Sequence, residues 1–172
     1  ASDVYKRQET TGLYADLAMV VAIGAVDLAN SKEFVFFSNN FKEERFVLEK
    51  FISLASKFDL LVGYNIENFD LPFIITRACI LGMDASLLSR KSKLDLLKVT
   101  RRVMKTRRLT LSKMKKLLNL NGHDYSGELV VLDYIRFLSG EKEVKRRIIG
   151  HLLSDLRATV EMFKLMKKFA LI

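Results

Sequence analysis

DLLVGYNIENFDLPFIITRACILG, residues 59–82, combines two secondary-structure signals in one short stretch. The apolar run over 59–64 has the length and composition of a buried strand, and it ends at Asn65. The pattern over 69–82 then predicts a helix, which tolerates Pro72 in its first turn. A buried strand that passes directly into a helix is typical of an α/β domain.

A hairpin is predicted before this stretch. MVVAIGAV, residues 19–26, has the composition of a buried strand, ANSK supplies a turn, and EFVFFS, residues 33–38, has the composition of a second strand. A helix is predicted next, over 41–58, because apolar residues recur there at helical spacing.

Four further helices are predicted in the second half of the chain. The first begins after Asp95 and turns Leu96, Val99 and Val103 inward. The second is expected to end at Gly122, a residue type that favours helix ends. The last three helices are predicted over 110–122, 128–140 and 141–169.

Together these elements predict one α/β domain over 9–172, with a mixed sheet flanked by helices. Only two whole strands precede the helix and strand at 41–64. Such a sheet looks as if its first strand, which should run directly into Glu9, is missing or replaced.

Composition narrows the class of protein. With 49% hydrophobic and 28% charged residues, the 172-residue chain has the composition of a globular domain. Its longest apolar run, over 17–26, is too short to cross a bilayer. The single cysteine, Cys79, argues against a disulfide framework and fits a cytoplasmic location. We expect Cys79 to be an inert core residue.

The positive charge is concentrated in one segment. The chain has a net charge of +9, and residues 90–116 contain twelve Lys or Arg and one acid, a local balance of +11. A concentrated basic stretch is typical of proteins that bind a phosphate backbone. The alternative is a solvated helix face that has no partner.

Acidic residues at three separate places are candidates for a site. Glu9 lies where a strand would give way to a turn, Asp70 follows the predicted strand at 59–64, and His151 and Asp155 lie four apart on one predicted helix. Each has a simpler interpretation: Glu9 as an exposed turn residue, Asp70 as a helix N-cap, and the pair as a surface contact. Asp95 is interpreted either as an N-cap or as a residue of the site.

The joint interpretation of these residues is chemical. Two divalent ions about 4 Å apart can activate a water molecule and stabilise the leaving oxygen in phosphodiester hydrolysis. Hard ions such as Mg²⁺ take carboxylate oxygens, so several carboxylates from separate elements must converge. A neighbouring histidine then takes the proton from the attacking water.

Three motifs carry a resemblance to a known family. ETTGL, residues 9–13, resembles the end of a motif that reads Asp-x-Glu-Thr-Thr-Gly-Leu, LVGYNIENFDLPFIITRA resembles a second motif, and HLLSD, residues 151–155, resembles a third. In this order they are similar to the DEDD (DnaQ-like) 3'–5' exonucleases, which have the RNase H-like fold. The resemblance is closest to relatives of the proofreading domain of family B DNA polymerases.

The resemblance implies a role for each matching residue. Glu9, Asp70 and Asp155 would bind two Mg²⁺ or Mn²⁺ ions, and His151 would be the general base. His151 occupies the position, four residues before the last Asp, where one subgroup of the family has Tyr. The implied substrate is the single-stranded 3' end of DNA or RNA. The residues implied to bind it are Thr10, Thr11, Gly12, Leu13, Asn65 and Phe69, and the basic stretch adds Arg101 and Arg102.

One residue departs from the family pattern. Arg7 stands where the first motif has its first Asp. A guanidinium at a site for two cations would repel both ions, so Arg7 and two-metal catalysis are incompatible. We therefore expect the chain as printed to bind metal poorly and to hydrolyse slowly or not at all.

The first eight residues, ASDVYKRQ, have a second explanation. They can be encoded by GCGTCAGATGTGTATAAGAGACAG, the transposon-end primer used in tagmentation sequencing libraries. The hypothesis is that residues 1–8 are a translated sequencing adapter and that the natural gene continues upstream of Glu9. The parent protein would then supply the missing Asp and the first strand.

The expected function is a metal-dependent 3'–5' exonuclease with a two-metal mechanism. One alternative is a non-catalytic nucleic-acid-binding module of the same fold, which Arg7 favours. The other is an accessory domain of a larger nuclease or helicase, with the basic stretch as its docking surface.

Overall fold

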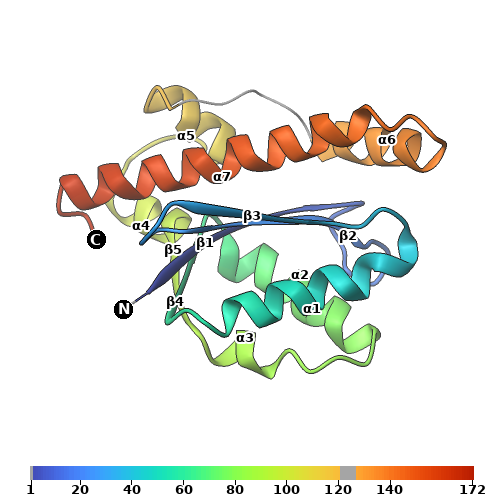
Figure 1. Ribbon diagram of the computed structural model, residues 1–172. Coiled ribbons are helices and arrows are strands. Elements are labelled where there is room, and N and C mark those ends of the chain that lie inside the picture. Colours follow the sequence, from blue (N-terminus) through green and yellow to red (C-terminus); the bar gives the residue numbers. More distant parts are fainter. Residues whose placement is uncertain (1, 121–126) are drawn as a thin grey trace.

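Strand β1 lies at the centre of a five-stranded sheet, between β2 and β4 (Figure 1). The computed structural model describes residues 2–120 and 127–172. The strand order is β3-β2-β1-β4-β5. The strands are β1 (Asp3–Thr10), β2 (Val20–Asp27), β3 (Lys32–Phe37), β4 (Leu60–Gly63) and β5 (Ser92–Asp95).

The sheet is mixed, as the sequence predicts. Strands β1, β2 and β3 pair antiparallel, and the predicted hairpin joins β2 and β3. Strands β4 and β5 run parallel to β1, so the chain must cross over between them. The carboxyl ends of β1, β4 and β5 therefore meet at one edge of the sheet, which is the edge where Glu9 and Asp95 lie.

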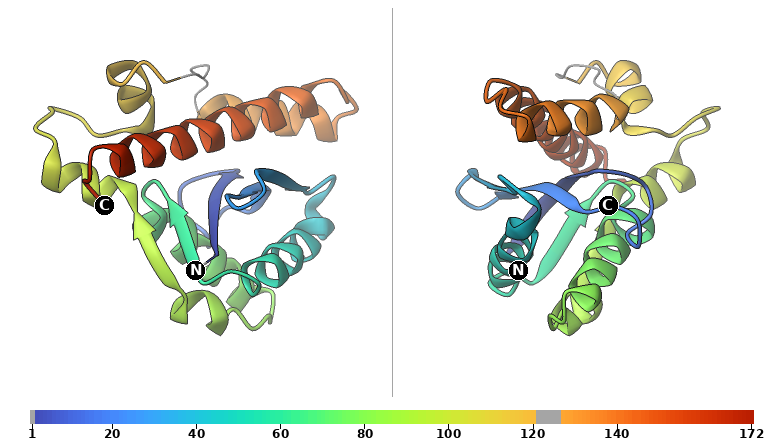
Figure 2. Two further views of the ribbon diagram at one scale, coloured as in Figure 1. Left: turned by 60° about the vertical axis from the view of Figure 1, so that its left-hand side comes forward. Right: turned by 90° about the vertical axis from the view of Figure 1, so that its right-hand side faces the viewer.

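Helices cover both faces of the sheet (Figures 1 and 2). One layer contains α1 (Glu44–Ala55), α2 (Leu71–Ile80) and α3 (Ser86–Arg90). The other contains α4 (Leu96–Val103), α5 (Leu111–Leu117), α6 (Gly127–Leu138) and α7 (Val144–Lys168). A 3₁₀ turn, η1 (Phe41–Glu43), leads into α1, and a π-helical turn, η2 (Ile66–Asp70), joins β4 to α2.

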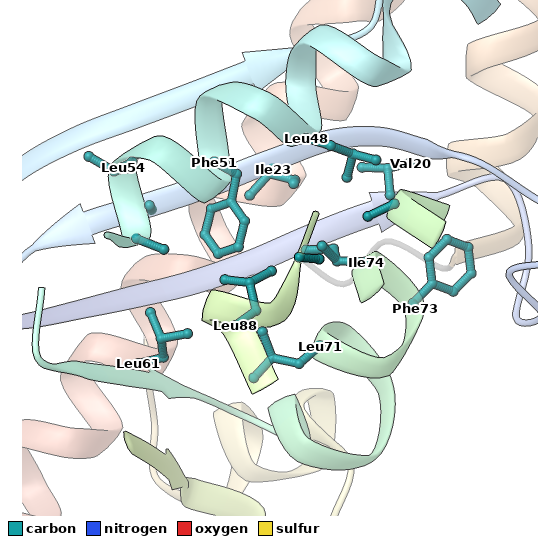
Figure 3. Close-up of a cluster of buried hydrophobic side chains, with 14 of the residues drawn as sticks. Val20, Ile23, Leu48, Phe51, Leu54, Leu61, Leu71, Phe73, Ile74 and Leu88 are labelled. Atoms are coloured by element: carbon teal, nitrogen blue, oxygen red, sulfur yellow. The ribbon is translucent and has the colours of Figure 1, made fainter. Parts of the chain in front are cut away.

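The first layer packs through a large apolar cluster (Figure 3). Phe51 and Leu48 of α1 and Ile74 of α2 are fully buried against Val20 and Ile23 of β2. These helices bury one face because their apolar residues recur at helical spacing. The predicted strand at 59–64 and the predicted helix at 69–82 are both confirmed, as β4 and as η2 with α2.

Helix α7 packs across the opposite face of the sheet. It lies close to β2 at Gly24, where an added Cβ would stand 3.1 Å from Leu152 Cγ. Phe163 of the same helix packs edge-on against Tyr5 of β1. Helix α7 is thus fixed over β1 and β2, and this placement brings its polar residues above the centre of the sheet.

The place of the first strand is filled, so that strand is not missing. Residues Asp3–Thr10 form β1, and residues 3–8 make up most of it. Its side chains alternate between the layers: Val4 belongs to the cluster under α1, and Tyr5 to the cluster under α7. Both faces of β1 are therefore buried, and every side chain that it carries must fit one layer or the other.

Several predictions about individual residues are wrong. Cys79 was expected in the core but is exposed, because α2 turns Phe73, Ile74 and Ala78 inward and Cys79 falls on the opposite side. Val103 is 40% exposed rather than inward, because it ends α4. Strand β5 and helix α3 were not predicted. The expected helix end at Gly122 lies outside the described residues.

Within the described ranges, no helix combines the length and the apolar character needed to cross a membrane.

The core of the first layer gives a testable prediction. Phe51→Ala removes a fully buried ring, and we expect a loss of about 3–5 kcal/mol in the free energy of unfolding, measured by urea denaturation. Phe46→Ala is a matched control on the same helix, because Phe46 is 53% exposed. We expect a loss of less than about 1 kcal/mol there. Equal losses in the two variants would contradict the assignment of Phe51 to the core.

Candidate functional site

Three carboxylates from three elements converge at the carboxyl end of β1. Glu9 lies at the end of β1, Asp70 at the end of η2, and Asp155 in the middle of α7. All three residues are buried, with exposed fractions of 5%, 1% and 6%. We call these three residues the carboxylate cluster. The structure brings together the acidic residues that the sequence placed far apart.

His151 joins the cluster from α7. Its Nε2 lies 3.5 Å from Glu9 Oε1 and 3.8 Å from Asp155 Oδ2. The simpler interpretation of His151 and Asp155 was a surface contact, but both residues are buried. Burial lowers the pKa of His151, although the nearby Asp155 charge opposes this effect. His151 is thus a neutral imidazole near neutral pH.

Two buried lysines and one partly exposed arginine face the carboxylate cluster. Lys6 Nζ lies 3.1 Å from Asp70 Oδ1, Arg7 Nη2 lies 3.2 Å from Asp155 Oδ2, and Lys115 Nζ lies 2.9 Å from Asp155 Oδ1. We call Lys6, Arg7 and Lys115 the cation triad. Lys115 was counted among the basic residues of a solvated or nucleic-acid-binding segment, but it is only 4% exposed. Its position was not predictable from the sequence, because it depends on how α5 packs against α7.

The cluster perturbs the groups within it. Burial raises the pKa of Glu9 to about 8, the Arg7 charge opposes the rise, and the charges of Asp155 and Asp70 add to it. For Arg7, burial disfavours the charge, but the neighbouring carboxylates more than offset this and raise its pKa. These effects show that the three acids and Arg7 interact within one electrostatic site.

Lys6 and Gln8 occupy a part of β1 that faces the apolar layer. Lys6 is 1% exposed, and its Nζ lies 5.6 Å from the centre of the Phe51 ring. It also donates a hydrogen bond of 2.7 Å to Gln8 Oε1. Burial lowers the pKa of Lys6 to about 8, although the Asp70 charge opposes this. Gln8 Nε2 is buried and donates to no group in the described residues.

Of the two candidate N-cap residues, Asp95 caps its helix and Asp70 does not. Asp70 precedes α2, but its side chain makes no capping bond and instead contacts Lys6. Asp95 caps α4 through the amide of Leu97, at 2.9 Å, and also accepts from the amide of Asn65, at 2.9 Å. Asp95 therefore braces the turn after β4, where Asn65 has a left-handed backbone with φ 62°.

The loop after Glu9 is held in place by hydrogen bonds. Thr10 Oγ1 donates to Gly12 O at 2.7 Å, and Thr11 Oγ1 accepts from the Met19 amide at 2.9 Å. Leu13 is 76% exposed at the tip. A cavity of about 430 Å³ lies beside the loop, and its lining residues are Thr10, Gly12, Leu13, Gly127, Glu128 and Val131.

An ion pair between α1 and α2 also contacts the loop between β1 and β2. Arg77 of α2 donates two hydrogen bonds to Glu44 of α1, at 2.9 and 2.6 Å, and a third to Ala15 O at 3.0 Å. Glu44 also accepts from the Val20 amide at 2.8 Å. This pair was not predictable from the sequence, because its two residues lie on different helices that meet only in the folded chain.

Of the other predicted substrate residues, two line a second cavity, one lines a third, and one lines neither of these. A cavity of about 440 Å³ is lined by Asn65 and Arg101, together with Arg7 and Arg108. Phe69 lines a smaller cavity of about 160 Å³, which it shares with Leu13 of the loop. Arg102 is exposed on α4 and does not line these cavities.

The residues present do not fit a divalent metal ion as they stand. Both oxygens of Asp155 already contact cations, and Asp70 Oδ1 contacts Lys6. Across residues 2–120 and 127–172, no three acidic, histidine or cysteine side chains are arranged to hold a metal ion. The donor types are right for Mg²⁺ or Mn²⁺, but cationic side chains already contact Asp70 and Asp155.

Comparison with known proteins gives one family and one fold. A sequence profile of the RNase H superfamily matches residues 5–167. No curated protein sequence matches the chain. Among solved structures, the family B DNA polymerase from the hyperthermophilic archaeon Pyrobaculum calidifontis is similar, with a TM-score of 0.84 and 16% identity. The match covers 99% of this chain and 25% of the polymerase, so the chain spans about a quarter of that protein.

The raised pKa of Glu9 predicts a pH dependence of stability. The folded chain holds the Glu9 proton up to about pH 8, whereas the unfolded chain releases it near 4.5. Unfolding therefore releases the Glu9 proton between about pH 4.5 and pH 8, so the free energy of unfolding falls as the pH rises through this range. The free energy of unfolding of the unmodified chain, minus that of Glu9→Gln, is expected to fall by about 3–4 kcal/mol between pH 5 and pH 8.

This comparison removes the opposite contribution of His151, because both chains retain that residue. Urea denaturation at each pH gives the two free energies. Parallel pH profiles for the two chains would show that Glu9 is not held protonated in the fold.

Proposed function

The chain belongs to the RNase H superfamily, and we propose that its domain over residues 9–172 is a metal-dependent 3'–5' exonuclease. Its substrates would be the single-stranded ends of DNA or RNA. The nuclease-type fold supports hydrolysis of nucleic acid in general terms. The direction of cleavage and the two-metal mechanism are the proposal.

The observation that carries the proposal is the convergence of Glu9, Asp70 and Asp155 beside His151. Four polar groups from distant parts of the chain are buried together at the edge where β1 and β4 end. Burying like charges together is costly, so such a cluster indicates a functional site rather than a structural one. The motif order in the sequence supports the same conclusion.

Each residue of the site has a proposed role in the natural protein. Glu9, Asp70 and Asp155, with an Asp in place of Arg7, would hold two Mg²⁺ or Mn²⁺ ions. Hard divalent ions supply charge stabilisation for phosphodiester hydrolysis when they are bound. His151 would accept a proton from the attacking water, which its neutral state allows.

The substrate strand is proposed to lie across the three cavities beside the site. The loop over Thr10–Leu13 would hold the terminal nucleotide, and Phe69 would lie beside it. Asn65 and Arg101 would contact the following part of the strand. The basic stretch, including Arg102, would add a salt-sensitive attraction for the phosphate backbone.

Residues 1–8 are proposed to be foreign to the natural protein. A central strand that is covered on both faces ordinarily reads as a nearly continuous apolar run, as β2 does. Strand β1 instead places Lys6 and Gln8 against an apolar layer, and it places Arg7 against three acids. This mismatch supports an adapter origin, and the codons at the genomic locus would test it.

A non-catalytic nucleic-acid-binding module is the second candidate. The contacts of Arg7 and Lys115 with Asp155 favour it, because they neutralise the acid that the third motif contributes. An accessory domain of a larger nuclease or helicase is a third candidate, which fits a chain that spans a quarter of the similar polymerase.

A gain of activity tests the first candidate. Arg7→Asp removes the repelling guanidinium and adds the missing carboxylate, so we expect hydrolysis to rise at least about a hundredfold in Mg²⁺ or Mn²⁺. A 5'-labelled single strand should shorten stepwise from its 3' end, as read on a denaturing gel. EDTA should abolish the reaction.

Two controls separate the carboxylate from the loss of the cation. Arg7→Asn removes the guanidinium without adding a ligand, and it should regain little activity. Adding Asp155→Asn to Arg7→Asp should abolish the gain while single-strand binding persists. Strand shortening that survives Asp155→Asn would reject the assigned site, and binding without shortening in Arg7→Asp would favour the non-catalytic module.

The basic stretch predicts the salt dependence of binding. We expect the double variant Arg101→Gln, Arg102→Gln to flatten the slope of log affinity against log salt by about 1.4 for a single strand. Fluorescence anisotropy in EDTA measures binding without hydrolysis. The control, Lys50→Gln with Lys57→Gln, removes two exposed charges from the α1 layer and should change the slope little. Equal changes in both variants would mean that the attraction is not localised on α4.

A further inference from the structure

The carboxylate cluster and the cation triad contain equal numbers of acidic and basic side chains. Three acids, Glu9, Asp70 and Asp155, face three bases, which are Lys6, Arg7 and Lys115. The bases come from two elements, β1 and α5, while the acids come from β1, η2 and α7. The balance therefore depends on the tertiary fold.

Two of the three cations, Lys6 and Lys115, are buried as deeply as the acids. Lys6 and Lys115 are 1% and 4% exposed, and the Arg7 side chain is 25% exposed. Lysine is almost never buried to this extent unless it is paired. Removing one partner of a buried pair is strongly destabilising, because the other charge is left uncompensated. Each member of the triad thus lowers the cost of burying the acid beside it.

A metal ion entering this site would compete with the cation triad for the carboxylate oxygens. To reach both oxygens of Asp155, an ion would have to displace Arg7 from one and Lys115 from the other. The displaced cations would remain nearby, since Lys115 is buried on α5 and Arg7 lies on the central strand β1. Repulsion between them and a divalent ion in a low-dielectric environment would then oppose binding.

We propose that Lys6, Arg7 and Lys115 act as internal counter-ions that replace metal in this chain. Asp70 and Asp155 are neutralised by these side chains, so the chain folds fully without divalent ions and takes none up at the cluster. The inference concerns stability and metal uptake, and it holds whether or not any form of the domain hydrolyses nucleic acid.

The first experiment measures metal uptake by the unmodified chain. A titration with Mn²⁺, followed by the electron paramagnetic resonance signal of the free ion, should show less than one ion bound per chain at millimolar concentration. The melting temperature should differ by less than about 1 °C between EDTA and excess Mg²⁺ or Mn²⁺. Stoichiometric Mn²⁺ binding with a raised melting temperature would overturn the proposal.

The second experiment exchanges a counter-ion for a ligand. Arg7→Asp should lower the melting temperature in EDTA by on the order of 10 °C, because it adds an acid and removes a cation. Excess Mn²⁺ should recover at least half of this loss. The matched control is Arg157→Asp, the same change at an exposed site on α7 that pairs with Glu33. Its melting temperature should not respond to Mn²⁺, and an equal response in both variants would overturn the proposal.

A third variant keeps the test decisive if Arg7→Asp does not fold. Lys115→Met removes one cation at similar size, and we expect its melting temperature to fall by several degrees, whereas Lys115→Arg should retain most of the stability. Unchanged stability in Lys115→Met would overturn the counter-ion role. If Arg7→Asp gains Mn²⁺-dependent stability but does not cut, the proposed function fails and this inference stands.

Discussion

Strand β1 is the constraint on which the rest of the structure depends, because it has a neighbouring strand on each side and a helical layer on each face. Its side chains alternate, so a polar residue at any position is buried in one layer or the other. Residues 6–9 are all polar. The fold accommodates them because Asp70 and Asp155 approach from opposite directions and pair with Lys6 and Arg7. The acids at the sheet edge thus stabilise a central strand that its own composition would not.

The pairing of buried carboxylates with cationic side chains also determines the chemistry of the site. Three buried carboxylates repel one another, and this repulsion must be relieved either by bound cations or by cationic side chains. In this chain Arg7 and Lys115 contact both oxygens of Asp155, so relief comes from side chains. Burial, with smaller contributions from the Asp155 and Asp70 charges, raises the pKa of Glu9 to about 8, and the Arg7 charge offsets only part of this rise. A site that holds a proton on one acid and cations on the others has no need of metal to fold.

Much of the fold could be predicted from the sequence, because its signals are local. The hairpin β2–β3 and the helices α1, α2 and α7 follow from apolar periodicity. Strand β5 was missed because SKLD is short and has no apolar alternation. The positions of Glu9, Asp70 and Asp155 were predicted through motif order, whereas Lys115 was not. A lysine in a basic segment looks solvated until α5 is placed against α7, and that packing is not encoded at one position.

Position 7 therefore decides between two kinds of site within one fold. The backbone of β1 is fixed by its register with β2 and β4, so exchanging its side chains need not move Glu9, Asp70 or Asp155. With Arg at position 7, Asp70 and Asp155 form ion pairs with side chains of the protein itself. With Asp there, the formal charge of the site becomes two units more negative, and repulsion among the acids favours divalent cations instead. The fold supplies the convergence of the acids, and one side chain on the central strand determines what neutralises them.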